Sequence, residues 1–532
     1  GAHSCSYRDL NSTMITETTV VGGDDCNDDA MYTYIGAAPQ TNSTACLTDL
    51  DGDGFSDRSW DLCSQQLTFD DARYTVQGDV TSAVVWAAGV GDFDGDSTPD
   101  ILYGKGSNSV LTSLVPLSGD AFSPSTSVLN QTAGDIEVIP PTQDYPKRYQ
   151  ISTIDDFDGD GFSEFAYGYG FGGGLETGLY RPGSITLHRS TSFLNTMSSS
   201  VPDIEWFGPN SSAVLHGLVN AGDIDNDGLG DLLLLARLAE QDFVDVGKAY
   251  LFYGSTLSTL GGTVDVNTAD KIFIGVSDNY NRFATVADID GDSLPDILLT
   301  SWDSLDVPYS GTVYVFLGSS LPNLPTEITM DLADITLAGG VERGWVGTGL
   351  SSAGDVDGDG KEDILVPQYQ GLYVSQDHLL VLGKDIPTSG VVDINTITSL
   401  QFTGQEYFTP GSTGDFKGFN KSVGDIDGDG LGDIMMNWHT SSGTWNTAVF
   451  TGQSIADLLE EGSDTGLDTG SNAFPVIVPF QDADFLIEDV QYGHALGDFD
   501  NDGLDDIVLS NYTMNYAANS GGVIGIFSAC EN

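Results

Sequence analysis

The chain has 532 residues, and 79 acidic against 17 basic side chains give it a formal charge of -62 and a pI near 4.1. This excess of negative charge argues against nucleic acid and anionic membrane surfaces as partners, because both carry charge of the same sign. No run of 18 apolar residues occurs, so no membrane-spanning segment is predicted. The chain begins at Gly1 without a methionine, which favours a processed protein or a cloned fragment whose signal peptide and any anchor are absent. Together these features indicate an extracellular protein, either secreted or held at a cell surface.

Residues 1–64 are predicted to form a separate metal-binding segment that is rich in Cys and Asp. A segment this small has little core, so disulfides and metal are its expected stabilising elements. Four of the five cysteines lie in it and the fifth lies near the end of the chain: Cys5, Cys26, Cys46, Cys63 and Cys530. Residues 23–29, Gly-Asp-Asp-Cys-Asn-Asp-Asp, resemble a metal-binding motif of large secreted bacterial proteins. Two alternative disulfide pairings of Cys63 are considered, one with Cys530 and one with Cys46.

A nine-residue acidic motif, Asp-x-Asp-Gly/Asn-Asp-Gly/Ser-x-x-Asp/Glu, occurs eight times. Its copies start at Asp49, Asp92, Asp156, Asp223, Asp288, Asp355, Asp425 and Asp498. From Asp92 onward the intervals are 64, 67, 65, 67, 70 and 73 residues. Such a period is typical of an architecture that repeats one supersecondary unit. The copy at Asp49 is followed by Arg58, Ser59 and Trp60 instead of an apolar strand, so we assign it to the N-terminal segment.

The residue types of the motif indicate calcium. This ion binds six to eight oxygens, and a tight loop supplies them from alternating positions. Magnesium prefers a smaller octahedron that keeps water, and zinc prefers His or Cys, which these loops lack. We therefore expect about eight calcium ions, seven of them in the repeats, and Gly at the positions between the ligands where the loop turns sharply.

The predicted ligands are the carboxylates of motif positions one, three, five and nine and the backbone carbonyl of position seven. In the N-terminal segment and the first three repeats these are Asp49, Asp51, Asp53, Phe55 and Asp57; Asp92, Asp94, Asp96, Thr98 and Asp100; Asp156, Asp158, Asp160, Phe162 and Glu164; and Asp223, Asp225, Asp227, Leu229 and Asp231. In the last four repeats they are Asp288, Asp290, Asp292, Leu294 and Asp296; Asp355, Asp357, Asp359, Lys361 and Asp363; Asp425, Asp427, Asp429, Leu431 and Asp433; and Asp498, Asp500, Asp502, Leu504 and Asp506.

Four strands are predicted in each repeat, joined antiparallel and without a convincing amphipathic helix. A short apolar run such as 364–366 follows the acidic loop, and a second apolar strand such as 247–254 comes next. A more polar stretch such as 331–339 precedes the strand that enters the next loop, as at 350–354. Seven such sheets arranged radially predict an all-β fold, a seven-bladed β-propeller over residues 65–532.

Residues 354–366, Gly-Asp-Val-Asp-Gly-Asp-Gly-Lys-Glu-Asp-Ile-Leu-Val, resemble the FG-GAP repeat of integrin α-subunit head domains. The resemblance implies a seven-bladed propeller with calcium loops and a role in recognition or adhesion. The namesake dipeptide is degenerate, as in Tyr492-Gly493, and Val366-Pro367-Gln368 stands where the family has Gly-Ala-Pro. In integrins only some blades carry calcium, whereas all seven repeats here have the acidic positions. This departure weakens any transfer of integrin ligand specificity.

The last repeat has its third strand at 522–527 and lacks a fourth before the chain ends at Asn532. Residues 67–78 match the polar fourth element of the other repeats and precede the first repeat's acidic loop. We therefore expect this stretch to pair into the last blade and to close the ring.

A partner is expected on the face opposite the acidic loops. Successive connections of an antiparallel sheet open on opposite faces, so the variable loops after the second strands share the other face. These loops are rich in aromatic residues, which suit the recognition of a glycan or a protein: Tyr169, Phe171, Tyr180, Trp302, Tyr309, Tyr369, Tyr373, Trp438, His439, Trp445, Tyr512 and Tyr516.

No catalytic motif emerges, because the sequence has no Gly-x-Ser-x-Gly, His-Glu-x-x-His or Walker loop and its six histidines are scattered. The leading hypothesis is an extracellular, calcium-stabilised recognition or adhesion module, with the head of a larger surface protein as one form of it. A polysaccharide lyase or another carbohydrate-active propeller enzyme is the first alternative. A structural component of a surface layer or filament is the second.

Overall fold

The computed structural model describes four short strands at the N-terminus and much of residues 66–527. In that range the longest segments outside the description are 118–127, 131–148, 170–181, 191–200, 404–419, 465–475 and 512–522. The chain divides into two compact units, Gly1–Gln65 with Ser528–Asn532, and Gln66–Phe527. In the first unit β1 (His3–Arg8) pairs with β2 (Met14–Val20), and β3 (Thr33–Ile35) pairs with β4 (Cys46–Thr48). The Asp49 loop, Cys63 and Cys530 lie outside the described residues, so both disulfide pairings stay predictions.

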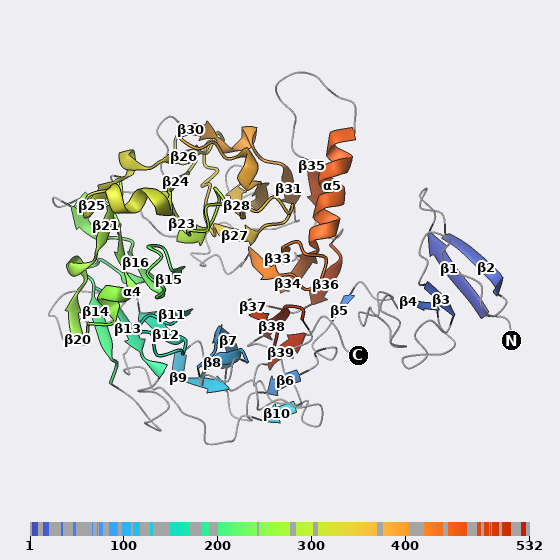
Figure 1. The fold of residues 1–532 in the computed structure, drawn as a ribbon, viewed down its shortest axis with the longest axis horizontal. Helices are drawn as coiled ribbons and strands as arrows, with labels where there is room; N and C mark the ends of the chain where they lie inside the picture. The colour runs from blue at the N-terminus through green and yellow to red at the C-terminus, as the bar shows by residue number, and fades with distance from the viewer. Residues whose placement is uncertain are drawn as a thin grey trace. The chain divides into compact units, whose positions relative to one another are not determined.

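The second unit is a β-propeller in which six sheets have five strands and a seventh sheet has three (Figure 1). The three-stranded sheet is β7 (Val84–Gly91), β8 (Asp100–Ser107) and β9 (Val110–Leu117). The next two sheets are β11 (Tyr149–Ile154), β12 (Glu164–Tyr169), β13 (Ser184–His188), β14 (Ile204–Phe207) and β20 (Gly262–Asp265); and β15 (Leu215–Gly222), β16 (Asp231–Ala236), β19 (Lys248–Phe252), β21 (Lys271–Ile274) and β25 (Glu327–Thr329).

The middle of the chain forms two further five-stranded sheets. They are β22 (Ala284–Ala287), β23 (Asp296–Ser301), β24 (Thr312–Phe316), β26 (Ile335–Ala338) and β30 (Gly390–Asp393); and β27 (Ser351–Gly354), β28 (Asp363–Tyr369), β29 (Gln376–Val381), β31 (Leu400–Thr403) and β35 (Val476–Pro479). A small hairpin, β17 (Glu240–Gln241) with β18 (Val244–Asp245), lies outside the large sheets.

The last two sheets combine both ends of the propeller chain. They are β32 (Asn420–Gly424), β33 (Asp433–His439), β34 (Trp445–Phe450), β36 (Phe485–Glu488) and β5 (Gln66–Leu67); and β37 (Tyr492–Gly497), β38 (Asp506–Asn511), β39 (Val523–Phe527), β6 (Tyr74–Gln77) and β10 (Val128–Asn130). The first strands β7, β11, β15, β22, β27, β32 and β37 contact one another in a closed ring around the centre (Figure 1).

The observed blades differ from the prediction in number and in width. Six complete blades are described, and not seven, because the sheet β7–β9 has only three strands among the described residues. Each complete blade has four antiparallel strands and a fifth, parallel strand that comes from the following repeat, as where β20 pairs with β14. The prediction of four strands missed the fifth because these edge strands are only two to four residues long, and β20 and β30 are largely exposed. Each blade is therefore bound to its neighbour by backbone hydrogen bonds at the rim.

Ring closure uses a strand from the start of the propeller chain. β6 pairs antiparallel with β39, and Thr75 lies opposite Gly525. β6 belongs to the stretch 67–78 that we expected to join the last blade. Just before it, β5 forms the parallel edge of the preceding blade. The two ends of the propeller chain are thus joined through two adjacent sheets.

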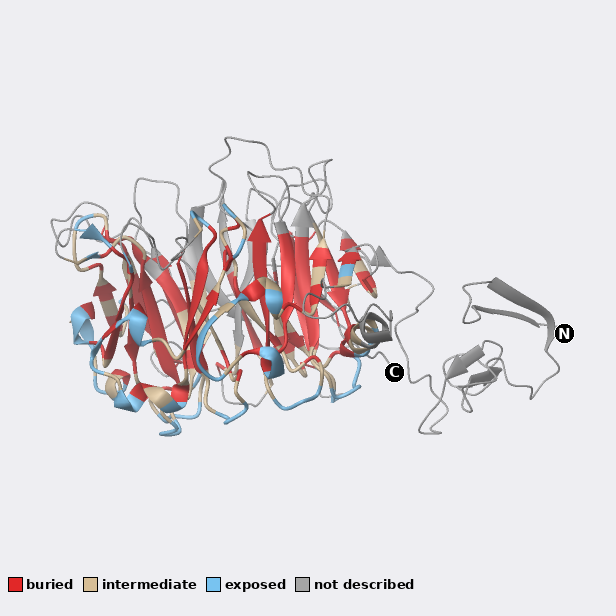
Figure 2. Ribbon diagram, turned by 90° about the horizontal axis from the view of Figure 1, so that it is seen from above, coloured by how far each residue is buried: buried red, intermediate tan, exposed pale blue. Residues whose placement is uncertain are grey.

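The apolar core lies between neighbouring blades. Second strands such as β16, β23 and β28 are buried along their whole length. An aromatic side chain of one blade's fourth strand repeatedly packs on the third strand of the next blade. The ring centroids are 5.4 Å apart in Trp206–Phe252, 4.9 Å in Phe273–Phe316 and 4.8 Å in Phe402–Phe450. Buried strands appear in red across the ring in Figure 2, with exposed residues along the connections at its edge.

Helices occur only in the connections among the described residues. The longest, α5 (Gly452–Asp464), contradicts the prediction that the repeats lack an amphipathic helix. Its signal is present in the sequence, because Ile455, Leu458 and Leu459 fall at helical spacing and pack into the core. The other helical turns are α4 (Gly254–Leu257), η3 (Val266–Thr268), η4 (Gly318–Asn323), η5 (Met330–Leu332), η6 (Gly383–Asp385) and η7 (Ile394–Thr396). No helix in the described part of the chain is long and apolar enough to cross a membrane.

The closing strand provides a test of the ring. Proline at Thr75 removes a backbone N–H from β6, which lies between β39 and β10 and is not an edge strand. We expect Thr75→Pro to destabilise the propeller by about 1–3 kcal/mol, because a buried strand loses a backbone hydrogen bond. The measurement is the thermal unfolding midpoint, with Thr75→Val as the control that keeps the N–H. Equal midpoints for the two variants would contradict closure by β6.

Candidate metal loops

Five of the acidic loops are described in full, those that start at Asp156, Asp223, Asp288, Asp355 and Asp425. Asp94 and Asp96 of the first repeat and Asp500 and Asp502 of the last lie outside the described residues. Each loop joins the first strand of a blade to the second. Because connections alternate between the faces of the ring, all these loops lie on one face, here named the acidic face. The connections between second and third strands, and those from a fourth strand to the next blade, lie on the other, here named the loop face.

The first aspartate holds the loop through its own backbone. Asp156 Oδ1 accepts hydrogen bonds from the N–H groups of Gly159 (2.6 Å) and Asp160 (3.1 Å), and Oδ2 accepts one from Gly161 (2.8 Å). Asp288 and Asp425 make the same three bonds. These bonds wind the chain so that its alternating side chains converge.

Two residues of each described loop adopt the left-handed conformation that favours glycine. Positions four and six of the Asp355 loop are Gly358 and Gly360, with φ of 72° and 86°. Asn226 takes the fourth position in its loop at φ 60°, and Ser293 takes the sixth at φ 70°. A non-glycine residue there costs about 1–2 kcal/mol. The loop geometry is therefore kept even where the glycine is absent.

The ninth carboxylate is buried and connects two parts of its blade. Asp231, for example, is fully buried; its Oδ2 accepts from Ile224 N–H (2.8 Å), and its Oδ1 accepts from Gly254 N–H at the end of the third strand (2.6 Å). Asp296, Asp363 and Asp433 make the equivalent pair of bonds. A Cβ added at Gly254 would lie 2.5 Å from Leu229 Cβ, so only glycine allows this approach.

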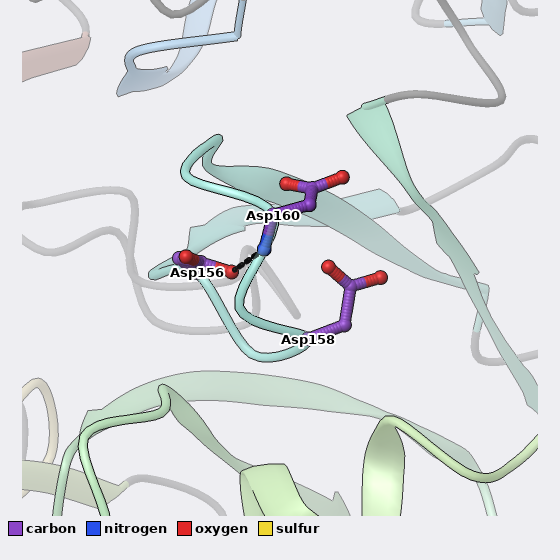
Figure 3. Close-up of side chains that lie close together, drawn as sticks. All are labelled: Asp156, Asp158 and Asp160. Atoms are coloured by element: carbon purple, nitrogen blue, oxygen red, sulfur yellow. Dashed lines mark hydrogen bonds between the residues drawn. The ribbon is translucent and has the colours of Figure 1, made fainter.

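Three of the four predicted carboxylates come together in each described loop, and in these five groups their oxygens lie within 4.8 Å of one another. In two loops the group is formed by positions one, three and five. These are Asp156, Asp158 and Asp160, shown in Figure 3, and Asp355, Asp357 and Asp359. Positions one, three and nine form it in the other three: Asp223, Asp225 and Asp231; Asp288, Asp290 and Asp296; Asp425, Asp427 and Asp433.

The carboxylate of position five holds the backbone of position seven within each described loop. The N–H groups of Phe162, Leu229, Leu294, Lys361 and Leu431 each donate to the fifth carboxylate, at 2.8–3.1 Å.

The donor set fits a hard cation. Three buried oxygens, Asp158 Oδ1, Asp225 Oδ1 and Glu164 Oε1, have no hydrogen-bond partner among the described residues. A buried carboxylate oxygen without a partner is costly, and a cation bound there would remove that cost. All side-chain donors in these groups are carboxylates, which matches calcium better than zinc.

Two loops carry a protein cation that the sequence analysis missed. Arg189 Nε lies 2.9 Å from Asp158 Oδ2, and its guanidinium stacks over Phe157. In another blade Lys384 Nζ pairs with Asp357. Both residues follow the third strand of their blade, which is the side that faces the acidic loop. A fixed positive charge reduces the negative potential that a metal ion would meet in these two loops.

Burial raises the pKa of the ninth carboxyl groups. The pKa rises to about 7 in Asp231, Asp296 and Asp363 and to about 8 in Asp433, because burial disfavours the charge and the loop's other carboxylates add repulsion. In Glu164 the same causes raise the pKa to about 9. Without a cation, these groups retain protons that free aspartate would lose.

On the loop face, the structure describes the side chains of only two of the predicted aromatic residues. Tyr309 is 49% exposed, whereas Tyr369 is buried at 2% exposure. The side chains of the others, from Tyr169 to Tyr516, lie outside the description. The sequence analysis missed Trp345, which packs edge-on against Tyr369 at 5.7 Å. Trp345 lies in the connection between two blades and not in a loop after a second strand, where the aromatic pattern predicts the partner-binding residues.

No protein-family model matches the chain. In sequence the chain is similar to phosphatidylinositol-glycan-specific phospholipase D. It is 28% identical to the human protein over 189 residues, which are 34% of this chain and 22% of that protein. It is 28% identical to the bovine protein over 159 residues, which are 28% of this chain and 18% of that protein. The chain therefore spans about a fifth of the length of these curated relatives.

Several solved structures are similar in arrangement. For the exotype rhamnogalacturonan lyase YesX the TM-score is 0.32, with 13% identity over 82% of this chain and 66% of that one. For the WD40 domain of Toxoplasma gondii coronin it is 0.35, with 8% identity over 71% and 70%. For the Dos1 propeller it is 0.38, with 8% identity over 87% and 96%. The strand pairing of this chain, rather than these scores, identifies the propeller.

The raised pKa values predict a pH dependence for the protein without a divalent cation. The unfolded chain titrates its aspartates near 3.8, whereas the folded chain binds protons on the ninth carboxyls up to pH 7 or above. Stability is therefore lost as pH rises through the folded pKa, and we expect a higher thermal midpoint at pH 6.5 than at pH 8 in excess chelator. An equal or higher midpoint at pH 8 would contradict the role of these groups.

Above about pH 6.5 the buried histidines do not interfere with this test. Burial lowers the pKa of His188 to about 4 and that of His378 to about 3. Both stay neutral in the folded protein over the whole window.

Proposed function

We propose that this chain is an extracellular, calcium-stabilised recognition or adhesion module that binds a glycan or protein ligand through the loop face. The observation that carries the proposal is the repeated geometry of the acidic loops. A group of three converging carboxylates recurs in five described loops on one face, which leaves the other face to the variable connections. Loops held by a rigid scaffold are the usual place for binding residues.

The calcium part of the proposal rests on the donor atoms. In each described loop the first and third carboxylates converge with either the fifth or the ninth, and buried oxygens in two of the loops lack any hydrogen-bond partner among the described residues. Bound cations would neutralise side chains that otherwise repel one another or keep protons. They would also neutralise part of the formal charge of -62. The loops of the Asp49, Asp92 and Asp498 copies belong to the same proposal by sequence.

We further propose that the complete ring has seven blades of the FG-GAP type. β7 contacts β11 on one side and β37 on the other, so the three-stranded sheet β7–β9 occupies a blade position between two complete blades. The acidic loop from Asp92 to Asp100 joins its first two strands, as in the other blades. Phe93 N–H donates to Asp100 (2.8 Å), which repeats the bond made by the ninth carboxylate elsewhere.

Calcium is expected to stabilise the protein at several sites at once. At a free concentration tenfold above the dissociation constant, each site contributes about 1.4 kcal/mol. Excess chelator should therefore lower the thermal midpoint sharply, and calcium should restore it. Asp225→Asn, in the third position of its loop, should reduce the gain from calcium, whereas Asp245→Asn, in the exposed hairpin β17–β18, should not. An unchanged unfolding curve in chelator would contradict structural calcium.

Ligand binding is tested by a glycan array in calcium, followed by hydrogen exchange with the best ligand. We expect slower exchange in the connections of the loop face, such as 307–311 and 339–350, and little change in the acidic loops. Protection of the acidic face alone would contradict the proposed surface. A lyase assay on the same glycans separates binding from catalysis, because unsaturated products would show an enzyme. Assembly into filaments on adding calcium would instead favour a structural role.

A further inference from the structure

Two connections of the propeller have the same backbone conformation and different side chains. Residues 208–215 lead into β15, and residues 339–346 lead into β27. In each, the last residue bridges to a glycine before the third strand of the preceding blade, Leu215 to Gly183 and Val346 to Gly311. In each, the fifth and seventh residues have positive φ. The two connections are therefore copies of one structural element.

The four residues with positive φ differ in chemistry. The first copy has Ser212 (φ 66°) and Val214 (φ 54°), and Val214 is buried at 5% exposure. The second has Arg343 (φ 59°) and Trp345 (φ 39°), and both side chains are partly exposed. The left-handed conformation is costly for each of these residue types. Since both copies adopt the left-handed conformation, the turn itself requires this conformation. The requirement of the turn does not explain why Arg and Trp occupy the second copy.

A neighbouring connection brings a third side chain to the same place. Trp345 N–H donates to the Tyr309 carbonyl at 3.0 Å, and Arg343 N–H donates to the Pro308 carbonyl at 3.1 Å. Tyr309 itself has a φ of 56° and is 49% exposed. We name Tyr309, Arg343 and Trp345 the Trp345 platform. It lies on the loop face, where the blades of β22 and β27 meet.

The platform rests on the adjacent blade. Gly344 accepts a hydrogen bond at its carbonyl from Tyr369 N–H (2.7 Å), and the Trp345 ring meets the buried Tyr369 ring edge-on, with planes 83° apart. These contacts hold the tryptophan without covering it completely. A rigid, partly exposed aromatic side chain is a good binding element because it loses little conformational entropy when a ligand binds.

Two polar groups at the platform are not satisfied by the described part of the chain. No carboxylate among the described residues pairs with Arg343, although the chain has 79 acidic side chains. Gln368 is 1% exposed, and its Nε2 has no acceptor among the described residues. A Cβ placed on Gly344 would lie 3.4 Å from Gln368 Cγ, so this amide lies directly beneath the connection. Both groups are hydrogen-bond donors, but the Gln368 amide is buried, so the partly exposed Arg343 is the group that favours a ligand with oxygen acceptors and negative charge.

We propose that the Trp345 platform binds an acidic saccharide, with a sugar ring against the aromatic side chains and its carboxylate on Arg343. This inference rests on the recognition function proposed above and names the ligand class of that surface. Guanidinium groups bind carboxylates through two parallel hydrogen bonds, which gives both affinity and orientation. Aromatic rings provide a flat apolar surface for the C–H groups of a pyranose.

An acidic saccharide fits the platform better than an acidic protein does. A stable protein interface buries roughly 800 Å² on each partner, with about 20–30 residues. The platform consists of three side chains on two connections tied by hydrogen bonds, which matches the size of one or two sugar rings. The strongly negative chain would also repel a large acidic protein, whereas a short saccharide meets mainly the local charge of Arg343.

The test compares trigalacturonate with galactotriose by calorimetry at fixed free calcium. These two probes differ at each ring by a carboxylate in place of a hydroxymethyl group. Arg343→Ser and Trp345→Val introduce the residues that the other copy of the connection carries at the equivalent positions, also with positive φ, so the fold is expected to survive. Ser212→Ala and Val276→Ala are the controls; Val276 is 40% exposed outside both connections. Thermal midpoints check folding.

We expect wild type to prefer trigalacturonate and Arg343→Ser to lose about tenfold or more in affinity for it. Trp345→Val should weaken both probes, and the controls should bind as wild type does. If both variants keep wild-type affinity while hydrogen exchange still places the glycan on the loop face, the Trp345 platform is not the binding site and the proposed function stands. If no saccharide binds wild type and an acidic peptide library binds through Arg343, the ligand class is wrong. If nothing binds the loop face, the proposed function fails as well.

Discussion

The propeller depends on a carboxylate buried at the start of each second strand. In the described blades this residue is 0–1% exposed, and it hydrogen-bonds the backbone of the acidic loop, as Asp363 does with Val356. In four blades it also holds the end of the third strand. Burying a charge without compensation costs several kcal/mol, so each site needs backbone N–H donors, a proton or a cation. The loop, the strand pair and the candidate metal group therefore depend on the same side chain.

Cohesion between blades has a second source in the exchanged edge strands. A short strand of one repeat pairs in parallel with the fourth strand of the preceding blade, and six such pairs are described. The aromatic contacts such as Phe402–Phe450 lie beneath the same boundaries. The boundaries with such aromatic contacts thus combine directional backbone bonds at the rim with apolar packing inside. A ring built in this way has few free edges, which protects it from pairing with other chains.

Much of this could be predicted from the sequence because the signals are local and repeated. The spacing of the acidic motif places every loop, and the apolar runs after it give the buried second strands. β6 could be identified because residues 67–78 resemble the fourth element that the last repeat lacks. Each of these inferences uses a local residue pattern and its recurrence along the chain.

The missed features depend on contacts between repeats or on signals too short to recognise. The fifth strands have two to four residues, and each forms only by pairing with the fourth strand of the preceding blade. Arg189 and Lys384 reach the acidic loops across their blades, and nothing in their own sequence neighbourhood shows this. Trp345 is a single aromatic residue in a connection, and only the fold brings it to Tyr309. Helix α5 is different, because its apolar residues fall at helical spacing within a single connection and are therefore a local signal.

The two copies of the left-handed connection show how the scaffold separates stability from recognition. In the copy with Ser212 and Val214 the conformational cost is present although neither side chain is suited to a ligand. The surrounding hydrogen bonds, such as Leu215 N–H to the Pro182 carbonyl at 2.9 Å, impose the turn whatever residue occupies it. Arg343 and Trp345 can therefore occupy the equivalent positions without altering the blade. Because the acidic loops and buried carboxylates lie on the opposite face, a change of ligand-contacting residues on the loop face leaves the stabilising groups untouched.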